Sequence, residues 1–161
     1  YRMKRLIAFT DPFQDASGSG YQLIQSLIAV GSGGFTGVGL GAGQQKLLYL
    51  PAAHTDFIFA VISEELGMIG AIFTLTLFIL IAWRGIKTSF AFKADPFRSS
   101  LSLGCTLLLV IPAFFNMCVV LGLLPTKGLV LPLVAYGGTA MIVHLILFGI
   151  LLRLSKVLQL K

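Results

Sequence analysis

The sequence predicts an all-α polytopic membrane protein with three transmembrane helices, a large extracytoplasmic loop that carries a short amphipathic helix, and a re-entrant loop. Of the 161 residues, 57% are hydrophobic and only 11% are charged, whereas soluble domains carry roughly 25% charged residues. The mean hydropathy is +0.93. A spanning helix needs about 20 mostly apolar residues, and three stretches supply them: 57–82, 99–124 and 139–153, the last with an apolar run that starts near 136.

Residues 1–56 are assigned to the large extracytoplasmic loop. The stretch DPFQDASGSG, positions 11–20, is rich in turn formers. The next ten residues separate into two helical faces, which predicts a short amphipathic helix on or in the membrane surface. Its apolar face holds Leu23, Ile24, Leu27 and Ile28, and its polar face holds Gln22, Gln25 and Ser26.

The run GSGGFTGVGLGAGQQK, residues 31–46, raises the question of a nucleotide-binding loop. It does not match the Walker pattern, because Lys46 follows glutamine and precedes leucine. It also fails the G-x-G-x-x-G pattern, since its glycines alternate at a spacing of two with no βαβ unit around them. Glycine-rich backbone beside a membrane instead favours tight turns and close helix contacts.

The first span, 57–82, contains two carboxylates. Thr55 and Asp56 are predicted to cap its start. Glu64 and Glu65 follow, roughly 13–15 Å into a straight helix, which would place them near the middle of the bilayer. Intramembrane carboxylates are costly and often functional. Pairing with polar groups of other helices, to hold the bundle together, is an equally open role for them.

Basic residues predict the orientation of the spans. The loop 83–98 carries Arg84, Lys87, Lys93 and Arg98 against a single aspartate, and the tail 154–161 is also basic. Because positive residues favour the cytoplasmic side, the loop and the tail are assigned to the cytoplasm, and 1–56 and 125–138 to the outside. This distribution accounts for much of the net charge of +6, so nucleic acid is not predicted as a partner.

The second span, 99–124, contains Pro112, which should kink it, and Asn116, an expected interhelical hydrogen-bond donor. The segment 125–138 is apolar but broken by prolines and glycines. Such backbone is tolerated at membrane depth only when it is buried in protein or lines a cavity. A re-entrant loop is therefore predicted, with Lys127 near that cavity.

Three motifs carry a resemblance to a known family. These are YRMKRLIAFTDPFQDASGSGYQLIQSLIAVGSGG, QKLLYLPAAHTDFIFAVISEELG and NMCVVLGLLPTKGLVLPLVAYGGTA, in that order along the chain. Together they resemble the SEDS family (shape, elongation, division and sporulation proteins of the FtsW/RodA/SpoVE type), and the QK…YLP and PTKG patterns are similar to its division type. The resemblance implies that this chain is the C-terminal portion of a bundle of about ten spanning helices and is inactive alone.

The resemblance also implies an activity and a location. Family members are peptidoglycan glycosyltransferases that polymerise lipid II into glycan strands at the outer face of the bacterial cytoplasmic (inner) membrane. A class B penicillin-binding protein supplies the transpeptidase, and the division type works with other division proteins at the septum, in septal cell wall synthesis. We expect the same multi-pass placement, lipid II as substrate, and the same class of partner here.

The resemblance places the family's essential acidic residue at Asp15, as a general base that helps an acceptor hydroxyl to attack. The diphosphate leaving group needs cations, from side chains or from a divalent ion such as Mg²⁺ or Mn²⁺; no cofactor is certain and no residue is predicted as a metal ligand. The candidate substrate-binding residues are Lys4, Arg5, Tyr21, Gln22, Gln25, Lys46, His54, Asp56 and Lys127. Binding to lipid headgroups is an open alternative for Lys4 and Arg5.

The chain departs from the family pattern at some positions. Phe13 stands where tryptophan is usual, Ala16 where proline is usual, and Ala52 where glutamate is usual. Two other function classes stay open. A lipid II transporter (flippase) would depend on Glu64 and Glu65 and tolerate change at Asp15, and a non-catalytic scaffold of the division machinery would tolerate change at all three.

Overall fold

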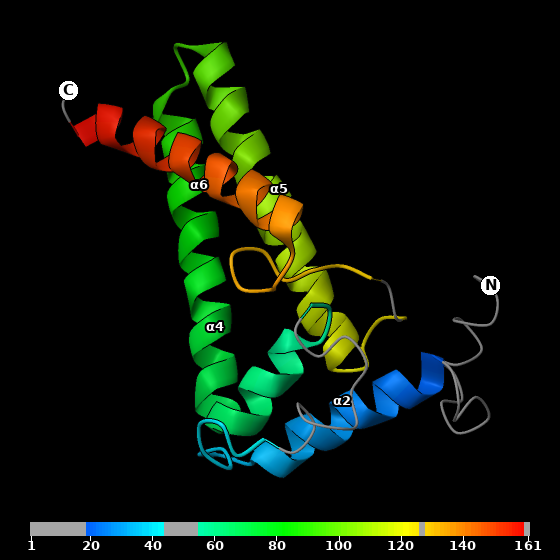
Figure 1. The fold of residues 1–161 in the computed structure, drawn as a ribbon. Helices are drawn as coiled ribbons and strands as arrows, with labels where there is room; N and C mark the ends of the chain where they lie inside the picture. Colours follow the sequence, from blue (N-terminus) through cyan, green and yellow to red (C-terminus); the bar gives the residue numbers. More distant parts are fainter. Residues whose placement is uncertain (1–18, 44–54, 126–127, 160–161) are drawn as a thin grey trace.

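The computed structural model describes residues 19–43, 55–125 and 128–159, and over these residues it confirms the all-α fold with three long apolar helices. The helices are α2 (Ser19–Gly33), α4 (Ile58–Ala91), α5 (Pro96–Val120) and α6 (Gly138–Gln159) (Figure 1). Helices α4, α5 and the Gly138–Val157 part of α6 are long and apolar enough to cross a membrane.

The helices extend beyond the apolar stretches that predict them. Most of the expected loop 83–98 is helical, because α4 continues to Ala91 and α5 already begins at Pro96. A proline suits the first turn of a helix, and the Asp95 carboxylate caps this one by accepting from the Arg98 backbone N–H at 3.3 Å. Helix α6 likewise passes the expected end at residue 153. Hydropathy marks where a helix meets lipid, whereas backbone hydrogen bonding decides where it ends.

Helices α4 and α5 form an antiparallel pair held by small residues. The Ser102 hydroxyl donates to the Gly85 carbonyl at 3.1 Å, and a β-carbon on Gly85 would overlap the Thr106 hydroxyl. Near the connecting turn, the Ser99 hydroxyl donates to the Ser89 carbonyl at 3.0 Å. Small residues at the contact let two membrane helices approach closely and exchange hydrogen bonds.

Helix α4 is not the single straight span that the sequence suggests. Gly67 has φ 65° and ψ −158°, which is not helical. In Figure 1 the first segment of α4 is turned sharply away from the axis of the remainder. The remainder, from residue 68 to 91, still extends about 36 Å at 1.5 Å per residue and can cross a bilayer by itself. The start of α4 also differs from expectation, because Phe57 holds the N-cap position with no side-chain cap hydrogen bond.

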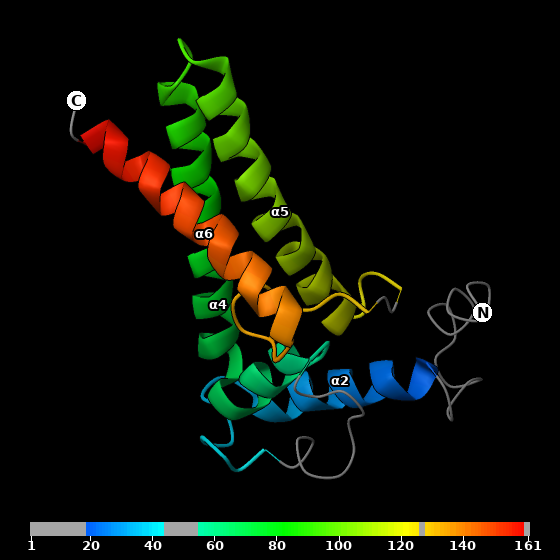
Figure 2. The same ribbon diagram turned by 45° about the horizontal axis from the view of Figure 1, so that its top comes forward.

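Helix α2 lies across the ends of α4 and α5 (Figure 2). It buries Leu23, Ser26, Ala29 and Gly33, while Leu27 and Ile28 are exposed. Ser26, assigned to the polar face, is thus buried against the protein, while Leu27 and Ile28 of the predicted apolar face stay exposed. Small residues are buried because they allow the α2 backbone to approach α4, and the exposed apolar side chains suit a helix at a membrane surface.

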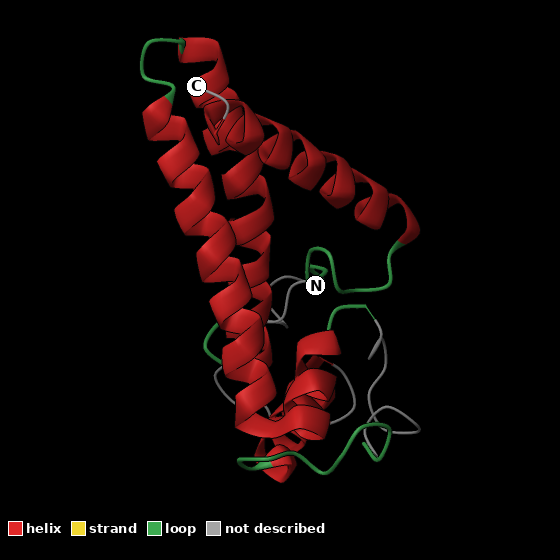
Figure 3. Ribbon diagram, turned by 90° about the vertical axis from the view of Figure 1, so that its left-hand side faces the viewer, coloured by secondary structure: helices red, strands yellow, loops and turns green. Residues whose placement is uncertain are grey.

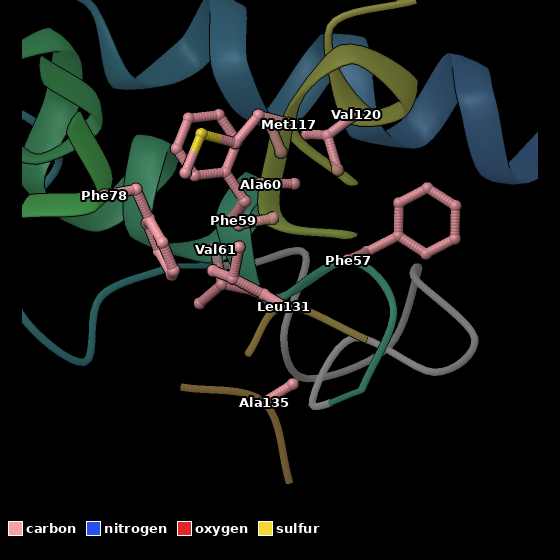
Figure 4. Packing of buried hydrophobic residues seen from close by; sticks show 11 residues of the cluster. Phe57, Phe59, Ala60, Val61, Phe78, Met117, Val120, Leu131 and Ala135 are labelled. Atoms are coloured by element: carbon pink, nitrogen blue, oxygen red, sulfur yellow. The ribbon is translucent and has the colours of Figure 1, made fainter. Parts of the chain in front are cut away.

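The core sits where α2, the first segment of α4, the end of α5 and the loop before α6 meet. Figure 4 shows Val61 next to Leu131, and both belong to one buried cluster with Phe59, Met117 and Ala135. Leu131 is fully buried. The part of the loop around Leu131 and Pro132 therefore packs inside the protein, as apolar backbone of this kind must within a membrane.

Helix α6 crosses the α4–α5 pair and diverges from it toward its own N-terminal end (Figure 3). Only 11% of its most apolar 18-residue stretch is buried within the described part of the chain. Its remaining surface is free to face lipid or other protein segments.

Candidate functional site

The break in α4 is filled by the glycine-rich segment that follows α2. In an unbroken helix the N–H groups of Met68 and Ile69 would donate to the carbonyls of Glu64 and Glu65. Here they donate instead to Gly34 and Phe35, at 2.9 and 3.4 Å. The vacated carbonyls of Glu64 and Glu65 accept from Val38 and Gly39, at 3.0 and 3.1 Å.

Four hydrogen bonds between α4 and the glycine-rich segment thus replace two hydrogen bonds within the helix. The Glu64 and Glu65 carbonyls and the Met68 and Ile69 N–H groups thus all keep a partner, so the inserted segment offsets the cost of interrupting the helix.

Glycine is required where the two backbones touch. A β-carbon on Gly33 would overlap the Ser63 carbonyl, and one on Gly37 would overlap the Glu65 carbonyl. A β-carbon on Gly67 would likewise overlap the backbone of Phe35 and Gly37. This contact requires glycine at positions 33 and 37, and at these two positions it confirms the prediction of close backbone approach.

The two carboxylates of α4 lie at this junction. Glu64 is 3% exposed and Glu65 is partly buried. A β-carbon on Gly43 would lie 2.9 Å from Glu64 Oε2 and 3.2 Å from Glu65 Cγ, so both side chains border the end of the glycine-rich segment. The expected straight helix is wrong, because both residues precede the break at Gly67 and belong to the segment that turns away; their depth in the bilayer stays a prediction.

Asn116, near the end of α5, joins two loops. Its side-chain amide donates to the Asp56 carbonyl at 2.7 Å and to the Leu129 carbonyl. The side chain is 2% exposed. Instead of bridging two helices, as expected, Asn116 fixes the entry to α4 against the loop that follows α5.

This bridge brings the Asp56 carboxylate to the start of the loop segment 128–131. A β-carbon on Gly128 would lie 3.1 Å from Asp56 Oδ2, so the carboxylate lies beside the Gly128 backbone. Asp56 is partly buried. The arrangement places one carboxylate next to the predicted re-entrant loop.

The N-terminal half of α2 contributes three of the predicted polar residues. Tyr21, Gln22 and Gln25 are all partly buried. The helix is held to α5 by Ser26, whose hydroxyl approaches the Val120 carbonyl at 3.2 Å and the Leu23 carbonyl at 2.8 Å. The end of α5 in turn packs Gly122 against Leu23 and Leu27.

Six of the predicted site residues lie outside the described residues: Lys4, Arg5, Asp15, Lys46, His54 and Lys127. The described residues that flank them are Ser19, Gly43, Thr55, Pro125 and Gly128. Helix α2, which begins at Ser19, lies at the end of the structure opposite the turn that joins α4 to α5 (Figure 1).

Three positions that shape this site were not singled out from the sequence. Gly67 makes the break, Gly128 admits the Asp56 carboxylate, and Ser26 anchors α2. A glycine directly after Glu-Glu-Leu inside a long apolar helix was the available signal for the break. No local pattern marks the other two, because their partners are distant in sequence.

Within residues 19–43, 55–125 and 128–159, no group of three or more His, Cys, Asp and Glu side chains is placed to hold a metal ion. A divalent cation for the diphosphate therefore stays a prediction.

Comparison with known proteins gives a match over almost the entire chain. The family model described as cell cycle protein, FtsW/RodA/SpoVE, matches residues 1–160. A probable peptidoglycan glycosyltransferase FtsW of Alkalilimnicola ehrlichii is 53% identical over 157 residues, covering 96% of this chain and 39% of that protein. The protein of the same name in Trichlorobacter lovleyi is 51% identical over 160 residues, covering 99% of this chain and 42% of that protein.

A solved structure shares the fold. It comes from work on the structural coordination of polymerization and crosslinking by a peptidoglycan synthase complex. One of its chains matches with a TM-score of 0.71 and 32% identity, over 98% of this chain and 42% of that one. This chain thus spans about two fifths of the length of the relatives that it matches.

Proposed function

This chain belongs to the FtsW/RodA/SpoVE family of cell cycle proteins, and we propose that the complete protein is a peptidoglycan glycosyltransferase that polymerises lipid II at the outer face of the cytoplasmic membrane. The observation that carries the proposal is identity above one half, across nearly the whole chain, to relatives named probable peptidoglycan glycosyltransferase FtsW. That name favours the division type and septal cell wall synthesis over elongation or sporulation.

The reaction joins two sugars. A hydroxyl of the acceptor sugar attacks the anomeric carbon of the donor sugar. The bond from that carbon to the diphosphate breaks, and the hydroxyl proton must leave. We assign Asp15 as the general base that takes this proton. The leaving undecaprenyl diphosphate gathers negative charge, which Lys4, Arg5, Lys46 and Lys127 would stabilise, with Mg²⁺ or Mn²⁺ as a further candidate for that role.

Support for this assignment comes from the described residues that adjoin the candidate residues in the sequence. Ser19 follows the segment that contains Asp15, Gly43 precedes the one that contains Lys46, and Gly128 follows Lys127. The break at Gly67 and the Asn116 bridge fix these points at one end of the bundle. Pre-positioned groups are what a glycosyl transfer between two bulky lipid-linked substrates needs.

Tyr21, Gln22, Gln25, His54 and Asp56 are proposed to bind the sugar and peptide groups of lipid II. All carry hydrogen-bonding groups, and those of α2 are partly buried beside the same end. A class B penicillin-binding protein is the proposed partner. Support for a partner comes from the related solved structure, which is a synthase complex that couples polymerization with crosslinking.

The test is polymerisation of purified lipid II by the complete protein, with and without the candidate transpeptidase partner. We expect glycan strands from the complete protein and none from residues 1–161 alone. Transport of lipid II without polymerisation, lost in Glu64 and Glu65 variants but retained in Asp15→Asn, would instead favour the transporter. No activity of either kind in the folded complex would favour the scaffold.

A further inference from the structure

A pocket of about 750 Å³ lies between α4 and α6, far from the candidate site and toward the turn that joins α4 to α5. Its size falls within the range of about 300–1,000 Å³ typical of small-molecule sites. The apolar part of its lining comes from Leu77, Leu80 and Ile81 of α4 and from Phe148, Leu151 and Leu152 of α6.

The polar part of the lining lies at one end of the pocket. Arg84 and Thr88 follow the apolar residues along α4, and Ser155 and Lys156 follow them along α6. Both helices run toward the same end of the molecule, where the C-terminal end of α6 lies near the α4–α5 turn (Figures 1 and 3). The pocket therefore changes from apolar to cationic in one direction, and in the predicted orientation that direction leads to the cytoplasmic face.

The charge at this end is unbalanced. Arg84 and Lys156 both line the pocket, and among the described residues no acidic side chain does so. The nearby carboxylate of Asp95 is paired with Arg98 at 3.1 Å. If an uncharged apolar helix covered the pocket, Arg84 and Lys156 would lose hydration without gaining a counter-charge, which is unfavourable.

From this arrangement we propose that the pocket binds an anionic phospholipid of the cytoplasmic leaflet. Its phosphate lies between Arg84 and Lys156, and an acyl chain extends along the leucine-lined part of the pocket. Basic residues beside a membrane attract anionic lipids, and a long apolar groove below them fits a hydrocarbon chain. The site is separate from the proposed glycosyl transfer, since it lies at the opposite end of the bundle.

The experiment measures lipid binding by the complete protein in detergent, by native mass spectrometry with added phosphatidylglycerol or phosphatidylcholine. The Arg84→Gln/Lys156→Gln double variant is expected to bind phosphatidylglycerol about tenfold or more weakly than the unaltered protein. A matched control is Lys87→Gln/Arg153→Gln, which removes the same charge from the same two helices three residues away, outside the pocket. This control should bind nearly as tightly as the unaltered protein.

A second pair of variants tests the acyl-chain part. Leu152→Trp fills the pocket and should weaken binding, whereas Leu145→Trp, on the same helix and equally exposed at 54% against 55%, should not. Equal binding of the two lipids by the unaltered protein, or equal losses in the charge variant and its control, would overturn the proposal. Absence of bound lipid would do so too, because another segment of the complete protein would then cover the pocket. Lipid binding is read without any assay of polymerisation, so this proposal can fail or succeed independently of the glycosyltransferase.

Discussion

The side-chain amide of Asn116 donates to the backbone carbonyl of Asp56 at 2.7 Å, across 60 positions of sequence. The same amide also donates to the Leu129 carbonyl, so one buried side chain holds the start of α4 against the loop after α5. The two segments it joins carry the Asp56 carboxylate and Gly128, the last residue of the LPTKG motif.

Replacement of Asn116 by alanine should therefore destabilise the protein. It leaves two carbonyl groups without this donor, and a buried polar group without a partner costs about 1–3 kcal/mol. We expect a lower unfolding temperature in detergent and a loss of polymerisation. Cys118→Ala, which changes a partly buried side chain on the same helix, is the control and should be mild. Equal stability of the two variants would show that the bridge is dispensable.

Gly67→Ala should disrupt the break in α4. The residue has φ 65° and ψ −158°, a conformation that is essentially restricted to glycine, and a β-carbon there would clash with Phe35 and Gly37. Backbone strain of this kind costs about 1–3 kcal/mol, before the clash is counted. Gly104→Ala is the matched control, because Gly104 lies in α5 with open space around it. That change should be neutral or stabilising by up to ~1 kcal/mol, as thermal unfolding would reveal.

Asp15→Asn tests the assignment of the general base. The change keeps size and polarity but removes the charge, and loss of a general base typically costs 10²–10⁴ in rate, about 3–5 kcal/mol at 1.36 kcal/mol per tenfold. Membrane insertion and thermal stability should be retained. Asp11→Asn, which precedes a proline in a turn-forming stretch, should polymerise lipid II at close to the normal rate. A normally inserted Asp15→Asn protein with unimpaired polymerisation would remove Asp15 from the mechanism.

The predicted orientation can be checked with single cysteines, after Cys105 and Cys118 are replaced by alanine. Tyr136 is exposed in the loop before α6, and Lys93 is exposed in the turn between α4 and α5. An impermeant thiol reagent applied outside intact cells should label Tyr136→Cys and leave Lys93→Cys unlabelled until the membrane is opened. The reverse pattern would place the candidate functional site in the cytoplasm and contradict the proposed reaction with lipid II outside.

The sequence by itself determined the fold class and the family. Three apolar stretches of sufficient length predict three membrane helices because hydrophobic transfer depends on the local composition of a segment, and the structure confirms them. The family resemblance rests on contiguous motifs such as LPTKGLVLPLVAYGG, which are visible in the chain whatever its fold, and the family match confirms it.

Only the tertiary structure decided how the site is supported. The break at Gly67 is stable because Gly34, Phe35, Val38 and Gly39 supply the hydrogen bonds that the helix gives up, and they lie about 30 residues earlier in the sequence. The burial of Ser26 in place of Leu27 depends equally on the nearness of Val120. Periodicity can identify an apolar face, but which face is buried depends on how closely two backbones approach, and that distance is set by residues from separate parts of the chain.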